Sequence, residues 1–248
     1  MGYELTTNFN ILLLALISGL ATFLGVYIGV RRKKTKENIV FGASFAAAIM
    51  IFISVFELIP SAYKASGVIS SFWIFIGILI LWLINMILPH IHNIEEIGEH
   101  KNKSLLKISY LLMVGMTLHN FPEGFAIASS FKTSASLGLI IVAATFFHKI
   151  PEGYALAVVS NSKKQKRLCY RSAVLSTFSI FLGALFGNIL ASKYIFLNPI
   201  LLSITAGAMI FVSFHELIPI GYKKGQKVTF FKAVSLASLL YFLLAITF

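Results

Sequence analysis

The chain has 248 residues, of which 58% are hydrophobic and only 12% are charged, and its formal net charge is +12. With a mean hydropathy of +0.86, it has too little polar surface for a soluble domain, so its positive charge does not indicate a soluble nucleic-acid-binding module. Its single cysteine, Cys169, excludes an internal disulfide and a thiolate metal cluster.

Eight apolar runs follow one another along the chain, each long enough to cross the hydrocarbon core of a bilayer as an α-helix. The predicted spans are residues 10–30, 39–62, 71–89, 105–129, 136–160, 172–192, 198–220 and 231–248. The first run has neither a positive start nor a small-residue cleavage site, so we expect it to be a retained helix. Because the connecting loops are short, we expect one all-α transmembrane domain over residues 1–248, in the cell membrane.

Most lysines and arginines lie in alternate loops, those that follow the first, third, fifth and seventh predicted spans. These loops hold runs such as RRKK at 31–34 and KKQKR at 163–167, whereas the other loops hold only Lys64, Lys132 and Lys193. By the positive-inside rule, the basic loops face the cytosol and both termini lie outside, which requires an even number of spans. The basic runs are therefore predicted to be topology anchors in contact with the lipid bilayer rather than ligand-binding patches.

Two segments of the chain repeat. Residues 47–64 (AAIMIFISVFELIPSAYK) match residues 206–223 (AGAMIFVSFHELIPIGYK) without a gap, and residues 119–124 (HNFPEG) match residues 148–153 (HKIPEG). The first match pairs span 2 with span 7 and the second pairs span 4 with span 5, so the copies run in opposite directions. We therefore predict inverted repeats, spans 1–3 and 6–8 around the span 4/5 pair, an arrangement found in transporters with a site near the midplane.

Ionisable groups inside the predicted spans indicate function, because a charge at bilayer depth is costly. His119 and Glu123 lie four residues apart on span 4, and His148 and Glu152 do so on span 5, so each pair shares a helix face. Two facing helices then offer two imidazoles and two carboxylates, which suit zinc, iron(II), manganese, cobalt or cadmium better than calcium or magnesium. A structural hydrogen bond would explain one buried residue more easily than two copies of one motif.

Lys149 lies three residues before Glu152, so the two side chains can meet on one helix. We expect Lys149 to contact Glu152 and Glu123 and to supply a fixed positive charge where a second metal ion would otherwise bind. The alternative is a wet cavity in which Lys149 touches no ligand.

Other polar groups lie nearer the span ends. Glu57 is close to the outer end of span 2, and His215 and Glu216 are close to the inner end of span 7. These three residues are predicted to admit and release the ion, with helix-end anchoring as the alternative. Met50 is expected to be a packing residue, with a thioether ligand as the alternative.

The loop at residues 90–104 is cytosolic by the charge pattern and carries His90, His92 and His100 beside three glutamates. It is predicted either to bind or sense released metal, through His90 and His92, or to be a solvated polar loop.

Together these motifs resemble the ZIP (ZRT/IRT-like) metal transporters, in particular their bacterial zinc/iron-uptake branch. The resemblance rests on HNFPEG, HKIPEG, HELIP at 215–219 and the histidine-bearing loop, and it covers essentially the whole chain. It implies eight spans with both termini outside, import of zinc, iron(II) or related ions into the cytosol and, in many members, a homodimer. It also implies that Asn120 joins His119, Glu123, His148 and Glu152 as a ligand, and that the Met50 region contributes.

The chain departs from the family pattern at two positions. Members often have an asparagine or aspartate ligand where this chain has Lys149, and they often add an acid from span 6, where residues 176–181 offer none. The resemblance gives these positions to the second metal of two-metal members, so we expect one ion here.

Two rival functions remain at this stage, an intramembrane zinc hydrolase and a metal sensor. HELIP lacks the second histidine of HExxH, because Pro219 takes that position. The sequence also has no Walker A motif, so ATP is not the expected drive. We therefore expect a transporter rather than an enzyme, with no resident cofactor.

Overall fold

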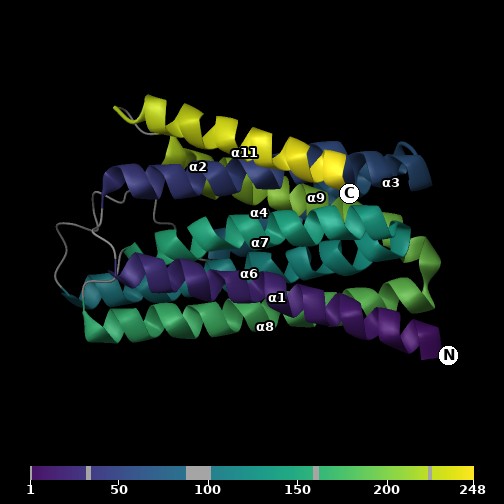
Figure 1. Cartoon of the computed structure of the whole chain (residues 1–248), viewed down its shortest axis with the longest axis horizontal. Helices are drawn as coiled ribbons and strands as arrows, with labels where there is room; N and C mark the ends of the chain where they lie inside the picture. Colours follow the sequence, from purple (N-terminus) through teal and green to yellow (C-terminus); the bar gives the residue numbers. More distant parts are fainter. Residues whose placement is uncertain (1, 32–34, 88–101, 159–161, 223–224) are drawn as a thin grey trace.

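The computed structural model describes residues 2–31, 35–87, 102–158, 162–222 and 225–248, and these residues fold into a bundle of long helices (Figure 1). Helix α1 begins and α11 ends at the same end of the bundle. The predicted loop residues His90 and His92 lie outside the described part of the chain. The elements are α1 (Gly2–Arg31), α2 (Lys36–Phe52), η1 (Ile53–Leu58), α3 (Ile59–Ser66), α4 (Ile69–Ile87), α6 (Asn102–Thr133), α7 (Ala135–Val158), α8 (Lys163–Lys193), η2 (Ile195–Leu197), α9 (Asn198–Val212), η3 (Ser213–Leu217), α10 (Ile218–Gly221) and α11 (Lys227–Thr247).

Seven segments in the described part of the chain are long and apolar enough to cross a membrane. They are Asn8–Arg31, Lys36–Ser66, Ile69–Met86, Ala135–Ala157, Lys163–Lys193, Ile195–Gly221 and Lys227–Thr247. Helix α6 has 32 residues and contains the predicted span 105–129, but it carries the polar stretch HNFPEG and is not one of the seven. The all-α fold is thus confirmed in the described residues, with seven candidate membrane spans, and α6 as an eighth span stays a prediction.

One predicted loop is wrong, because the basic residues after span 5 are helical. Helix α8 begins at Lys163, well before the predicted start at residue 172. Ser162 caps it: the Ser162 hydroxyl accepts from the Gln165 backbone N–H, and the Gln165 side chain accepts from the Ser162 N–H. This capping box fixes the helix start, so the basic cluster lies on the first turns of α8.

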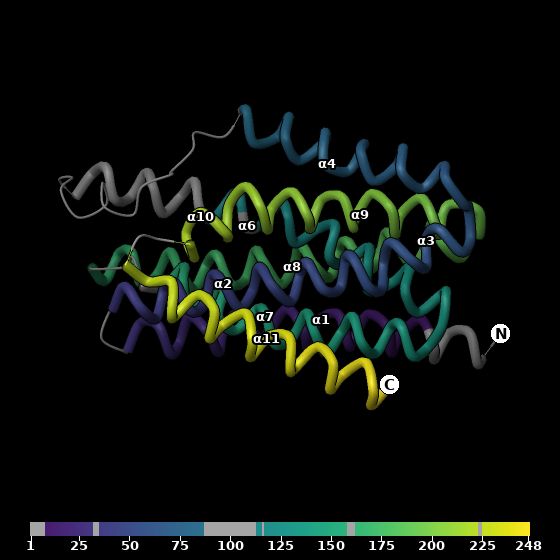
Figure 2. The backbone as a smooth tube through the Cα atoms, turned by 90° about the horizontal axis from the view of Figure 1, so that it is seen from above, coloured from purple at the N-terminus to yellow at the C-terminus, as the bar shows by residue number. Residues whose placement is uncertain are grey.

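The helix packing has the pairing that the repeat predicts. Helix α1 packs along α7, and its repeat counterpart α8 packs along α6. In the same way, α2 packs along α11, and its counterpart α9 packs along α4. The contact of α2 with α7 has its counterpart in the contact of α9 with α6 (Figure 2). Exchanging α1 with α8, α2 with α9, α4 with α11 and α6 with α7 therefore preserves each of these main contacts, with α6 and α7 at the centre.

Glycines permit the closest of these helix crossings. A Cβ atom on Gly124 of α6 would lie 2.1 Å from the Ile180 carbonyl oxygen of α8, and one on Gly153 of α7 would lie 2.3 Å from the Thr22 carbonyl oxygen of α1. No side chain fits at such distances, so these positions need glycine. Both glycines directly follow a Pro-Glu pair, so each helix contacts its neighbour directly beside the glutamate of the motif.

Two π-helical turns interrupt the second and seventh spans at repeat-related places, η1 at Ile53–Leu58 and η3 at Ser213–Leu217. At each, a serine hydroxyl donates to the carbonyl four residues earlier: Ser54 to Met50 at 2.7 Å and Ser213 to Met209 at 2.8 Å. A proline follows each widened turn, and proline disturbs the turn before it because it lacks an N–H and its ring crowds the preceding carbonyl. The sequence prediction had these segments as ordinary α-helix.

Candidate metal centre

Four of the five predicted ligands lie together in the middle of the bundle, His119 and Glu123 on α6 and His148 and Glu152 on α7. Their exposed fractions are 8%, 1%, 0% and 7%. Both helices continue through an internal proline, Pro122 in α6 and Pro151 in α7. A spacing of four residues places each histidine above its glutamate on one face of their helix. These two faces meet where α6 packs against α7.

The histidines and glutamates pair crosswise between the helices rather than within each one. His119 Nε2 lies 3.0 Å from Glu152 Oε1, and His148 Nε2 lies 3.3 Å from Glu123 Oε1. The repeat relates His119 to His148 and Glu123 to Glu152, so the two pairs are copies of each other. The pseudo-two-fold axis that relates the inverted repeats therefore passes through this cluster.

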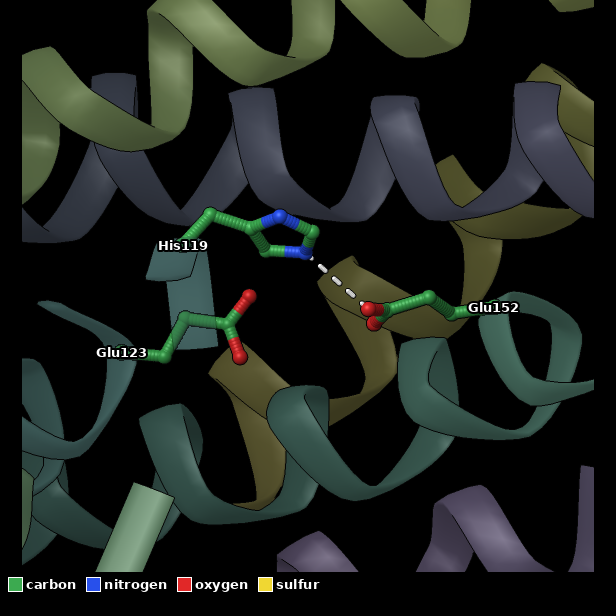
Figure 3. A group of neighbouring side chains, drawn as sticks. All are labelled: His119, Glu123 and Glu152. Carbon is green, nitrogen blue, oxygen red and sulfur yellow. Dashed lines mark hydrogen bonds and ion pairs between the residues drawn. The ribbon is translucent and has the colours of Figure 1, made fainter. Parts of the chain in front are cut away.

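Three residues bring potential ligand atoms close enough for one ion. One atom each from His119, Glu123 and Glu152 lies within 4.8 Å of the others. Figure 3 shows the imidazole and both carboxylates directed into the same space, with the contact from His119 to Glu152 dashed. Nitrogen and carboxylate oxygen are ligands that zinc and its neighbours accept.

His148 is beside this group and has a fixed orientation. Its Nδ1 lies 2.9 Å from the Ala144 carbonyl oxygen, and a carbonyl only accepts, so Nδ1 carries the proton. In a neutral ring, Nε2 then presents a lone pair toward Glu123 Oε1, which is also an acceptor. Metal-binding histidines are commonly oriented in this way, by a hydrogen bond from the other ring nitrogen to a backbone carbonyl.

Lys149 contacts both carboxylates, as the sequence predicts. Its side chain is fully buried, and its Nζ lies 2.7 Å from Glu123 Oε2 and 2.5 Å from Glu152 Oε2. It also donates to the Asn120 side-chain oxygen. A buried charge needs such partners, because an unpaired charge at this depth costs several kcal/mol.

Ser176 of α8 has a role that was not predicted, since residues 176–181 were noted only for carrying no acid. This buried serine accepts a hydrogen bond from the Asn120 side-chain nitrogen, so both ends of the Asn120 amide have partners. The predicted ligand Asn120 thus lies at the site, bound to Lys149 and Ser176. The sequence does hold a signal for the position of α8. Phe-Leu-Gly at 23–25 recurs at 181–183 and relates α8 to α1, so α8 could have been predicted to pack against the centre.

The predicted accessory residues lie outside the three-residue group. Met50 is buried at 2% exposure within the apolar core. Glu57 in η1 accepts a hydrogen bond from the Tyr241 hydroxyl at 2.7 Å and lines a cavity of about 460 Å³. In η3, His215 accepts from the Asn85 side-chain amide at 2.9 Å, and its neighbour Glu216 is half-buried.

A bundle of membrane-length helices with internal pseudo-symmetry and a buried charged cluster on its axis has the architecture of a membrane transport protein. The comparisons agree with this class. The family model described as ZIP Zinc transporter matches residues 89–246, and the chain belongs to the ZIP family. It is accordingly a multi-pass membrane transporter of metal ions and not an enzyme.

Several relatives resemble this chain over most of its length. It is 32% identical over 221 residues to the zinc transporter ZupT of Escherichia coli O7:K1, a match that covers 84% of this chain and 85% of the relative. The zinc transporter ZupT of Salmonella arizonae is 32% identical over 222 residues, with the same coverage. The ZupT of Shigella dysenteriae serotype 1 is 32% identical over 221 residues.

Proposed function

We propose that this chain imports zinc into the cytosol through a site formed by His119, Glu123, Glu152 and His148. The observation that carries the proposal is the buried group of three ligand atoms within 4.8 Å on the axis between α6 and α7. His148 would join as a fourth ligand through Nε2, which already faces Glu123. The related proteins named above are zinc transporters, and the mixed nitrogen and oxygen set would also accept iron(II), manganese, cobalt and cadmium.

The proposed membrane topology has eight spans, with α6 as the fourth and both termini outside. The helix ends that carry Arg31, Lys36, Lys163 and Lys227 lie at the end of the bundle opposite the start of α1 (Figure 1). Placing that basic end in the cytosol satisfies the positive-inside rule and puts the loop at 90–104 in the cytosol. The membrane potential then drives import, at about 4.6 kcal/mol per 100 mV for two charges, without ATP.

The path to and from the site is proposed to pass the two π-helical turns. Glu57 in η1 lies toward the outer end and lines a cavity with Lys64 and Ser136, so it would receive the ion. His215 and Glu216 in η3 would release it on the cytosolic side. Widened turns of this kind are frequent at functional sites.

Purified protein in sealed liposomes tests the proposal. With an inside-negative potential, the wild type should accumulate zinc, and competing cobalt or cadmium should slow the initial rate. Glu152→Gln keeps the shape of the side chain but removes its charge, and it should abolish uptake. Zinc binding without any flux would favour the sensor alternative and contradict the proposal.

A further inference from the structure

The ammonium group of Lys149 lies among three oxygen atoms: it donates hydrogen bonds to Asn120 and Glu152 and forms an ion pair with Glu123. An ammonium has three N–H groups, and three oxygens surround this one: Glu123 Oε2, Glu152 Oε2 and Asn120 Oδ1. The side chain is 0% exposed. Lys149 is therefore enclosed by oxygen atoms of the site, unlike a surface lysine that exchanges its contacts with water.

The two carboxylates divide their oxygens between two kinds of partner. The Oε1 atom of each faces a histidine, at 3.0 Å for Glu152 and 3.3 Å for Glu123. The Oε2 atom of each faces Lys149. The centre thus has a histidine side, which offers nitrogen and oxygen ligands to an ion, and a lysine side, which a positive charge already fills.

The lysine side is also held in place by a hydrogen bond to α8. The Asn120 side-chain nitrogen donates to Ser176 of α8, which aims the Asn120 oxygen at Lys149. Asn120 occupies on α6 the position that Lys149 occupies on α7, one residue after the histidine of each motif. The pair therefore breaks the symmetry of the centre: the two positions facing each other across the axis are an amide and a cation.

We propose that Lys149 is a resident cation of the transport site, which takes the place of a second metal ion and limits each chain to one divalent ion on the histidine side. The inference rests on the proposed function and specifies how many ions its site holds. Two carboxylates and one ammonium carry a single net negative charge, so one divalent ion leaves a single positive charge. A second would leave three positive charges in a medium of low dielectric constant, where charge repulsion is strong.

Crystals grown with zinc test this inference, because anomalous scattering at the zinc absorption edge counts the ions in the centre. The informative variant is Lys149→Asn, which gives α7 the His-Asn pair that α6 already carries at 119–120. The matched control is Lys132→Asn, since Lys132 also donates to an asparagine side chain, that of Asn8, at 3.0 Å, but at a helix end far along α6. We expect one zinc in the wild type and in Lys132→Asn, and two in Lys149→Asn.

Two neighbouring zinc ions in the wild-type centre, or a single one in Lys149→Asn, would overturn the inference. If Lys149→Asn fails to fold, the wild-type crystal decides alone: one zinc beside His119 with the ammonium still on both Oε2 atoms supports it, and a displaced ammonium contradicts it. Failure of the proposed function is a separate result, because it would appear as zinc uptake that survives Glu152→Gln whatever the ion count.

Discussion

Each carboxylate at the centre already lies against a histidine ring and the Lys149 ammonium before any ion arrives. Glu152 lies between His119 and Lys149, and Glu123 lies between His148 and Lys149. An incoming ion can enter between a histidine nitrogen and a carboxylate oxygen with little movement, because zinc ligands about 2.0–2.2 Å from the metal are themselves about 3.3 Å apart in a tetrahedron. The contacts of 3.0 and 3.3 Å are therefore close to the spacing of a loaded site.

Removing either carboxylate should nearly abolish uptake. Glu123→Ala or Glu152→Ala deletes one ligand and leaves the Lys149 charge only half compensated. Loss of a residue that merely orients a ligand costs about 10–100-fold, so we expect at least a hundredfold fall in the initial rate of zinc uptake into liposomes. Size-exclusion profiles should show folded protein, and a folded variant with the wild-type rate would refute the ligand assignment.

The histidines should govern which metal is preferred. Imidazole favours zinc over manganese more strongly than carboxylate does, so His119→Ala and His148→Ala should each lower the ratio of zinc to manganese uptake. The measurement is competition between the two ions at equal concentration. If both variants keep the wild-type ratio, neither histidine is a ligand.

The sequence predicts those contacts of the centre that form between residues of one helix, because spacing along a helix determines which side chains share a face. Four-residue spacing places His119 over Glu123, and three-residue spacing brings Lys149 to Glu152. The crosswise pairing of His119 with Glu152 and the contact of Asn120 with Ser176 depend on how three helices cross, and periodicity within one helix carries no information on that.

At the scale of the element, close helix contact and helix capping decide where α6, α7 and α8 lie. Hydropathy located the spans, but it could not predict the two π-helical turns, which depend on backbone crowding ahead of Pro60 and Pro219. The early start of α8 was readable from the Ser162–Gln165 capping box. The spacing of the helices could not be predicted from the sequence, because the backbone that each glycine contacts is known only from the fold.

Gly124→Ala should destabilise the protein although it adds only a methyl group. That methyl would lie 2.1 Å from a backbone carbonyl oxygen of α8, so the helices must separate, and overpacking of this kind costs about 1–3 kcal/mol or more. Thermal unfolding in detergent should show a lower midpoint.

Gly115→Ala is the control in the same helix, because a Cβ there meets nothing within 4 Å. Alanine is a better helix former than glycine by about 1 kcal/mol, so this variant should unfold at or above the wild-type temperature. Equal midpoints for Gly124→Ala and Gly115→Ala would show that the crossing does not depend on close contact.

At the scale of the whole molecule, the inverted repeat gives the bundle two related ends that differ in charge. The basic helix ends gather on one side, while η1 and η3, each in the C-terminal part of its span, lie toward opposite ends of the bundle because the two spans run in opposite directions (Figure 2). We therefore expect Glu57 and Glu216, which are related by the repeat, to face opposite sides of the membrane.

Accessibility of these two positions measures the topology. In a Cys169→Ser background, Glu57→Cys should react with a membrane-impermeant thiol reagent added outside intact cells, and Glu216→Cys should react only in inverted vesicles. The unsubstituted Cys169→Ser chain is the blank. Labelling of both cysteines from one side would contradict the eight-span arrangement.

The paired π-helical turns also show that the two halves of the chain keep one register along their whole matching length. A π turn holds one residue more than the α-helical turn it replaces, so a turn acquired by one half alone would have shifted that half by one position. Yet residues 47–64 and 206–223 align without a gap across both turns. The two halves therefore carry the widened turn in the same register, and each turn holds a glutamate at the equivalent place, Glu57 in η1 and Glu216 in η3.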